Sequence, residues 1–503
     1  MAKGNTMFYR ALLLTGANLV LRAVGVGFQV YLSGQMGAAG IGLLQLTMSV
    51  CTLAMTAAMA GIRTGTMYLT AEALGKGRHG ELGRVLSACF RYSFAVSVAV
   101  AIAVYALTPW LAGYWIGDGR VVLALRLFAA FLPVVCLVGV LTGYYTAAGR
   151  VRALVVVELA EQAVSMTVGV LLLTLWADGD PGRACASVIG GSSVASVLTL
   201  LCLWCFRGRG SVGEHQRSPV MPRLLKVAVP LAFADVLRMG ISTAENLIVP
   251  RRLARYGDMA SAMADYGRVC GMVFPVVMFP ACILWSVAEL LIPELSRCAA
   301  GQRQRRIGYL TARSLRVALL YGLMAGGVLF VCAEGLGVLL YDSVEVGRLL
   351  RSYAILVPML YADSITDAVI KGMGQQVACV RYNTITSFLD VVILWVLLPR
   401  VGLGGYYFSF VVTHGLNFYL SLRRLRKVTG FAPALGIPLK AVIAAVLAAG
   451  ITSLLPGSAE TGALIFTGGV FLLVFTLSAV LLGAVRREDF HWLRSLAGGA
   501  DKC

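Results

Sequence analysis

The sequence has 503 residues, of which 59% are hydrophobic and only 13% are charged, and its mean hydropathy is +0.82. This balance excludes a soluble globular protein, because too few polar side chains are present to cover a water-facing surface. The formal charge of +19 does not indicate a nucleic-acid-binding protein, since the basic residues lie in short segments between apolar stretches. Such residues set membrane topology and contact anionic lipid.

Apolar stretches of membrane-spanning length recur along the whole chain. A bilayer core of ~30 Å requires ~20 apolar residues per helix. The stretches lack the alternation of a membrane barrel, so we predict an all-α polytopic membrane protein with about 14 transmembrane helices. The predicted spans are residues 11–33, 40–62, 85–108, 121–147, 154–176, 184–206, 227–250, 268–290, 314–340, 351–371, 383–399, 406–422, 437–455 and 462–484.

A polar, basic segment divides these spans into two groups. It predicts an N-terminal lobe of helices 1–6 (residues 1–206), a cytoplasmic basic linker (207–226), a C-terminal lobe of helices 7–12 (227–422), and two additional helices with a cytoplasmic tail (423–503). Two six-helix lobes that rock against each other are typical of secondary transporters.

Most of the 43 Lys and Arg fall in segments that are cytoplasmic if the N-terminus is inside. The sequence therefore predicts a multi-pass cell-membrane protein with both termini in the cytoplasm. One outer loop departs from this rule, because Arg251, Arg252 and Arg255 follow the seventh span; either the loop is tolerated or it serves the substrate. The twelve cysteines mostly lie inside apolar segments, among them Cys202, and we expect them to act as small buried hydrophobes.

Charged residues inside the spans are the candidate functional groups. Arg22 lies in the middle of the first span, where an isolated arginine costs ~2.5–3.5 kcal/mol on insertion scales, so it should face a cavity or a partner. Arg63, at the inner end of the second span, is either a substrate contact or a topology anchor. Glu158 and Glu161 share one face of the fifth span, which suits pairing with first-lobe arginines, sugar contact, a proton relay or cation binding.

Acidic residues of the second half are candidates for a coupling-ion site. Asp235 and Asp390 are the predicted carboxylates, and Asn383 and Ser387 are predicted to add oxygen ligands. Asp235 also stands three residues before Arg238, a spacing that favours an ion pair on one helical face.

The tenth span carries three charged residues at i,i+4 steps, Asp363, Asp367 and Lys371. We predict that Lys371 neutralises Asp367 near the inner surface. Prolines in the second half are predicted to bend helices, and they are Pro230, Pro275, Pro280, Pro293 and Pro358.

Residues 36–77, beginning MGAAGIGLLQLT, resemble the first-lobe signature of the stage V sporulation protein B family. Residues 245–257 (ENLIVPRRLARYG) and 265–297 resemble its second-lobe signature. That family belongs to the multidrug/oligosaccharidyl-lipid/polysaccharide exporter superfamily of flippases. The general likeness extends over about residues 5–430.

The first helix is also similar to that of lipid II flippases, in which an arginine, a glycine and then an Arg-Asp pair recur. Arg22 and Gly25 match this pattern, whereas Phe28 and Gln29 stand in place of the pair. The segments ADYGRV and LLIPELSR are similar to the start and end of their eighth helix. This resemblance implies a substrate-binding role for Arg268.

These patterns predict an alternating-access flippase for an undecaprenyl-diphosphate-linked saccharide, either a peptidoglycan precursor or a polysaccharide repeat unit, with spore cortex formation as one setting. The predicted substrate-binding residues are Arg22, Arg63, Arg268, Glu158 and Glu161, because pyrophosphate requires fixed cations and arginine supplies planar, bidentate donors. The alternative is a multidrug and toxic compound extrusion-type cation-coupled antiporter, which should place acidic groups in its first-lobe cavity.

We predict that the protein is not an enzyme and has no cofactor. No P-loop is evident, and the short outer loops do not favour a glycosyltransferase or ligase site. Energy is predicted to come from sodium, protons or the membrane potential, and no metal is expected beyond a monovalent cation. The predicted partners are the lipid-linked saccharide, membrane lipids and cell-wall assembly enzymes, with no nucleic acid, and we expect a monomer.

Overall fold

The computed structural model describes residues 2–59, 61–75, 79–206, 220–430, 436–455 and 460–484. Every regular element in these ranges is a helix, so the predicted all-α class is confirmed. Residues 207–219, most of the predicted linker, lie outside the described residues, as does the predicted tail beyond residue 484.

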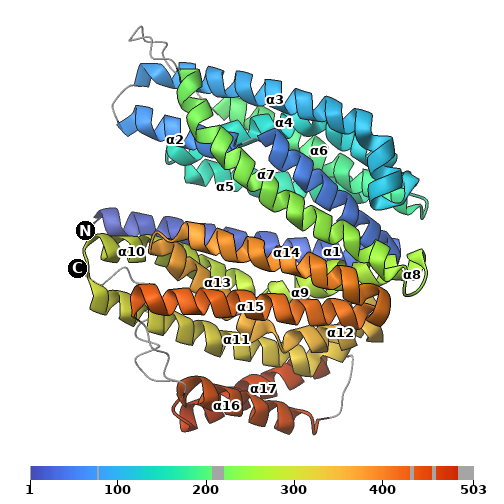
Figure 1. The fold of residues 1–503 in the computed structure, drawn as a ribbon, viewed down its shortest axis with the longest axis vertical. Coiled ribbons are helices and arrows are strands. Elements are labelled where there is room, and N and C mark those ends of the chain that lie inside the picture. Colours follow the sequence, from blue (N-terminus) through green and yellow to red (C-terminus); the bar gives the residue numbers. More distant parts are fainter. Residues whose placement is uncertain are drawn as a thin grey trace. The chain divides into compact units, whose positions relative to one another are not determined.

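The chain forms two compact units (Figure 1). The first unit comprises Gln35–Arg251 and Met259–Gly267. Its elements are the second half of α1 (Ala2–Met59), α2 (Ile62–Gly75), α3 (Leu82–Trp110), α4 (Val122–Ala147), α5 (Val151–Trp176), α6 (Pro181–Phe206), nearly all of α7 (Val220–Leu253), and α8 (Met259–Tyr266).

The second unit comprises the chain up to Gly34, Arg252–Asp258, and the chain from Arg268 onward. It contains the first half of α1 and most of the π-helical turn η4 (Gly267–Val273). Its other helices are α9 (Phe274–Met278), α10 (Ala281–Ala300), α11 (Gln304–Tyr341), α12 (Val344–Ala354), α13 (Val357–Gly372), α14 (Gln376–Val401), α15 (Leu403–Thr429), α16 (Gly436–Thr452) and α17 (Thr461–Leu481).

These units differ from the lobes predicted from chain order, because α7 packs with the first half of the chain. Leu224 and Ala228 of α7 share a buried apolar cluster with Ile62 and other residues of α2 to α6. Further along α7, the Asn246 amide donates to the Ser49 hydroxyl of α1 at 3.1 Å. The first half of α1 instead belongs with α9 to α17.

Gly37 divides α1 at the point where two predicted spans meet. Its φ of 67° and ψ of 176° interrupt the helical conformation, and this region of backbone space is open essentially only to glycine. The residues before Gly37 therefore leave the path of the residues after it, and the two halves of α1 serve different units.

Eight helices of the described ranges are long and apolar enough to cross a membrane, or up to ten if each bent pair is one span. The first of these, Leu19–Gly75, contains two of the predicted spans. Helices α7, α15 and α16 also overlap predicted spans, although α7 and α15 are more polar and α16 is shorter. The exact count of about 14 spans stays a prediction.

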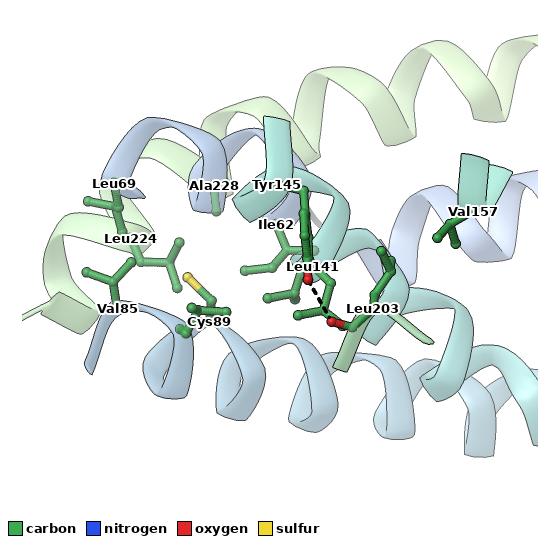
Figure 2. Close-up of a cluster of buried hydrophobic side chains, with 12 residues drawn as sticks. Ile62, Leu69, Val85, Cys89, Leu141, Tyr145, Val157, Leu203, Leu224 and Ala228 are labelled. Atoms are coloured by element: carbon green, nitrogen blue, oxygen red, sulfur yellow. Dashed lines mark hydrogen bonds between the residues drawn. The ribbon is translucent and has the colours of Figure 1, made fainter. Parts of the chain in front are cut away.

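A buried apolar cluster joins α2, α3, α4, α5, α6 and α7 of the first unit (Figure 2). Tyr145 of α4 lies within it, and its hydroxyl donates to the Leu203 carbonyl of α6 at 2.9 Å. That carbonyl is in the last turn of α6, where backbone acceptors lack helical partners. Cys89 lies in the same cluster as expected, whereas Cys202 is exposed because it faces away from the unit on α6.

Helices α16 and α17 form a pair that packs on α11 within the second unit (Figure 1). The contact face of α16 consists of Ala441, Ala444 and Ala448, which are fully buried. Such small residues allow close helix approach where the lipid provides no hydrophobic driving force. Phe471 of α17 fills the space that remains.

Proline interrupts helices at two of the predicted positions. Pro358 lies at the start of α13, where α12 and α13 are bent by 51°. Pro280 follows α9 at a second break, before α10. Pro230 and Pro293 lie inside α7 and α10 without ending them.

Candidate functional site

Arg22 lies on the first half of α1, in the second unit, and its side chain is exposed. Its guanidinium carbon is 4.1 Å from the ring centroid of Trp285 on α10. In the described part of the chain, no acidic side chain forms an ion pair with Arg22. An aromatic ring stabilises a cation by ~0.5–2 kcal/mol, which is less than the ~2.5–3.5 kcal/mol that an arginine costs in mid-membrane. The contact with Trp285 therefore offsets only part of the cost of placing the Arg22 charge in a membrane.

Arg268 is differently placed, because it already has an acidic partner. It lies in η4, and its Nη2 is 3.1 Å from Oε2 of Glu345, in the first turn of α12. Its side chain is 24% exposed, whereas that of Glu345 is 52% exposed. Arg22 and Arg268 belong to the same unit, whereas the predicted lobes 1–206 and 227–422 place them in different lobes.

The predicted first-lobe residues are brought together in the first unit. Arg63 of α2 acts electrostatically on Glu158 of α5. One turn along α5, Glu161 accepts a hydrogen bond from the Ser196 hydroxyl of α6 at 3.3 Å. The α2 backbone packs closely against α4 at Gly143, which has no side chain. A Cβ at this position would lie only 2.5 Å from the Arg63 carbonyl oxygen. The cluster holds two carboxylates and one arginine.

The predicted coupling-ion residues are divided between the two units, and their grouping stays a prediction. Asp235 of α7 is exposed and pairs with Arg238 at 3.6 Å, as the spacing predicts. Asp390 of α14 is only 8% exposed, and it belongs to the second unit. Asn383 and Ser387 are half-buried on α14, two turns and one turn before Asp390, respectively.

Helix α15 supplies polar partners that the sequence interpretation missed. The Ser409 and Thr413 hydroxyls donate to Oδ1 of Asp390 at 2.5 Å and 3.1 Å. The Asn417 amide donates to Oδ2 of Asp363 at 3.1 Å. Ser409, Thr413 and Asn417 are spaced four residues apart, and this periodicity was the signal available in the sequence.

An uncharged polar cavity of about 170 Å³ lies between α1 and α7 in the first unit. Its walls carry hydroxyl and amide groups with two methionines, and the lining residues are Gln45, Met48, Ser49, Thr52, Met239, Ser242, Thr243 and Asn246. Groups of this kind hydrogen-bond neutral polar molecules without favouring either sign of charge.

Helical bundles with charged side chains inside apolar spans define a multi-pass membrane protein built like a transporter. The chain belongs to the polysaccharide biosynthesis protein family, whose model matches residues 10–288. It is 22% identical over 414 residues to stage V sporulation protein B of Bacillus subtilis (strain 168), with 80% of each chain covered. It is also 22% identical over 222 residues to sporulation protein YkvU of the same organism, covering 42% of this chain and 50% of that protein.

Solved structures show the same fold at low sequence identity. The lipid II flippase MurJ in an inward closed conformation matches with a TM-score of 0.70 and 12% identity, covering 93% of this chain and 98% of that chain. An inward-facing multidrug resistance MATE family transporter matches with a TM-score of 0.66 and 12% identity, covering 82% and 96%. The predicted likeness to the stage V sporulation protein B family and its exporter superfamily is confirmed.

Proposed function

We propose that this protein is an alternating-access flippase that moves an undecaprenyl-diphosphate-linked saccharide across the cytoplasmic membrane. The main support for this proposal is Arg22. It is a cation in a predicted span, and its side chain contacts an aromatic ring rather than an acid. A pyrophosphate supplies the missing negative charge and accepts both arms of a guanidinium. The same cation disfavours a multidrug exporter for cationic compounds.

The remaining candidate residues suit the other parts of such a substrate. The uncharged cavity between α1 and α7 offers amide and hydroxyl groups to sugar hydroxyls. The Arg63, Glu158 and Glu161 cluster adds polar contacts of both signs in the same unit. Arg268 joins the pyrophosphate contacts if it exchanges Glu345 for substrate during the cycle.

We propose no covalent chemistry for this chain, in keeping with the transporters and flippase that share its fold. Energy would come from an ion gradient or the membrane potential. The relationship to stage V sporulation protein B makes spore cortex precursors the first substrates to test. A monomeric state, cytoplasmic termini and contact with cell-wall assembly enzymes stay predictions.

The test is transport of fluorescent lipid-linked saccharides in proteoliposomes containing the full chain. We expect Arg22→Ala to lower the flipping rate by about 10–100-fold, which corresponds to the ~1.5–3 kcal/mol of a charged hydrogen bond. Arg22→Lys should recover only part of the rate, because the bidentate fork is lost.

The matched control is Arg126→Ala, since Arg126 is also exposed and lies 5.2 Å from the Tyr105 ring. It should flip at the wild-type rate. Wild-type flipping by well-folded Arg22→Ala protein would refute the role of Arg22. Wild-type protein that flips neither peptidoglycan precursors nor polysaccharide repeat units would refute the proposed function.

A further inference from the structure

Asp363 and Asn417 form a pair in the second unit in which two buried oxygen atoms lack a hydrogen-bond donor. Asp363 of α13 is half-buried, and Asn417 of α15 is only 6% exposed. The Asn417 amide nitrogen donates to Oδ2 of Asp363 at 3.1 Å. Oδ1 of Asp363 and Oδ1 of Asn417 are both buried and both lack a hydrogen-bond partner. Two acceptors without a donor are thus held on two side chains already in contact.

The acid one turn along α13 is already neutralised, which isolates Asp363 as the unbalanced charge. Oδ2 of Asp367 lies 3.8 Å from Nζ of Lys371, and its Oδ1 accepts from the Ser421 hydroxyl at 3.3 Å. Asp363, Asp367 and Lys371 together carry one net negative charge when both acids are ionised. A buried carboxylate without a cation is costly, and such a group neutralises by taking a proton.

Apart from its neighbours on α13, Asp363 has no charged group acting on it within the described residues; His414 of α15, one turn before Asn417, acts electrostatically on Asp390 instead. Asp367 and Lys371 are the charged groups that act on it. From α14, the Cys379 thiol faces the same acids. Thiols are neutral near pH 7, so this group does not replace the missing positive charge.

The helices on the other side of α13 are likewise uncharged near this pair. At Tyr361 they present the Tyr321 phenol of α11 and the Cys282 thiol of α10. Glu294, farther along α10, is paired with Arg306 of α11 at 3.1 Å. Phenols and thiols are neutral near pH 7, and a paired carboxylate brings its own cation.

A single proton satisfies this pair better than a metal ion does. Hard cations require several oxygen ligands, whereas two unpartnered oxygens are present. The nearby hydroxyl of Ser364 donates to the Leu360 carbonyl instead. A proton on Oδ1 of Asp363 forms an O–H bond and removes the negative charge, while the Asn417 amide continues to donate to Oδ2.

We propose that Asp363 is a proton-binding site closed by Asn417, and that its proton is the ion coupled to transport. The proton enters from water and returns to water, with the carboxylate as its carrier. The coupling role rests on the proposed flippase function, whereas proton binding by Asp363 does not. This site differs from the predicted coupling residues: Asp235 already pairs with Arg238, and Asp390 has two hydroxyl donors.

Proton binding is tested by infrared difference spectroscopy of the purified full chain in lipid nanodiscs at neutral pH. The wild type should show the C=O stretch of a buried carboxylic acid at Asp363, and Asp363→Asn should remove that component of the band. Asn417→Ala should retain the band at a higher frequency, because the hydrogen bonds to the acid are lost. Asp342→Asn is the matched control, since Asp342 lies between α11 and α12 outside the spans, and it should leave the band unchanged.

An unchanged acid band in Asp363→Asn, or no such band in the wild type, overturns the site. A band that disappears when potassium chloride is replaced by sodium chloride overturns it in favour of a metal cation.

Coupling is tested separately in proteoliposomes. With one proton per cycle, a tenfold proton gradient should shift the steady-state distribution of the lipid-linked saccharide by about tenfold. Asp363→Asn should leave the distribution of the lipid-linked saccharide unchanged in the same gradient, as expected for an uncoupled carrier. A steady-state distribution that does not depend on the proton gradient in the wild type overturns the coupling claim. If no saccharide is flipped by any variant, the proposed function and the coupling role fail together, while the infrared band still decides proton binding.

Discussion

The contact between Arg22 and Trp285 can be measured by a double-mutant cycle. We compare the wild type with Arg22→Met, Trp285→Leu and the double variant, which keep apolar bulk at both positions. The separation of 4.1 Å lies within the range of a cation–π interaction, so the coupling free energy should be about 0.5–2 kcal/mol. Trp285→Leu should therefore cost more in the wild type than in the Arg22→Met background.

The two single variants should change the free energy of unfolding in opposite directions. An arginine in mid-membrane costs ~2.5–3.5 kcal/mol, and the ring offsets ~0.5–2 kcal/mol of it. Arg22→Met should therefore raise the free energy of unfolding, by up to about 3 kcal/mol, while it lowers transport. This opposition between stability and activity is expected where a charge is retained for substrate rather than for folding.

The assay is reversible chemical unfolding in mixed micelles, with and without inorganic pyrophosphate. Pyrophosphate should stabilise the wild type and leave Arg22→Met unchanged, because ligand that binds the folded state shifts unfolding by mass action. The Arg126 and Tyr105 pair, at 5.2 Å, serves as a reference cycle in the other unit. Additive effects at Arg22 and Trp285, or a destabilised Arg22→Met protein, would refute the reasoning.

Two further predictions concern the fold. Tyr145→Phe should lower the free energy of unfolding by about 1–3 kcal/mol, because the buried Leu203 carbonyl loses its donor; Tyr144→Phe is the control, and equal midpoints in chemical unfolding would contradict this. Gly37→Ala should cost about 1–3 kcal/mol, because alanine must adopt a backbone conformation that favours glycine. Gly34→Ala has open space around it as well, so equal thermal shifts for the two variants would contradict the strain argument.

Much of the helical architecture could be predicted from composition and periodicity. Lipid forces the backbone to bond within each segment, so an apolar stretch of sufficient length indicates a helix wherever it occurs. The break near Gly37 and the bends at Pro280 and Pro358 could also be anticipated, because glycine and proline restrict local backbone geometry in known ways.

The assignment of α1 and α7 to the two units could not be predicted from chain order. The two units depend on contacts between residues far apart in the sequence, such as Asn246 with Ser49 and Arg22 with Trp285. No local pattern specifies which helix supplies the partner. The exposed position of Cys202 has the same origin, because hydrophobicity in a span does not distinguish a lipid-facing side from a protein-facing side.

The polar face of α15 shows why the site was harder to predict than the fold. Ser409, Thr413, Asn417 and Ser421 recur at every fourth residue, yet hydroxyl groups in a span often bond only to their own helix. The structure shows that this face also serves acids on α13 and α14, because Asp390, Asp363 and Asp367 each accept a hydrogen bond from it. Among these acids, Asp390 has two donors and Asp367 has a lysine, whereas Asp363 has one amide and an unpartnered oxygen. Since a buried carboxylate with few donors gains most from a proton, this difference in donors supports Asp363 as the proposed proton-binding group.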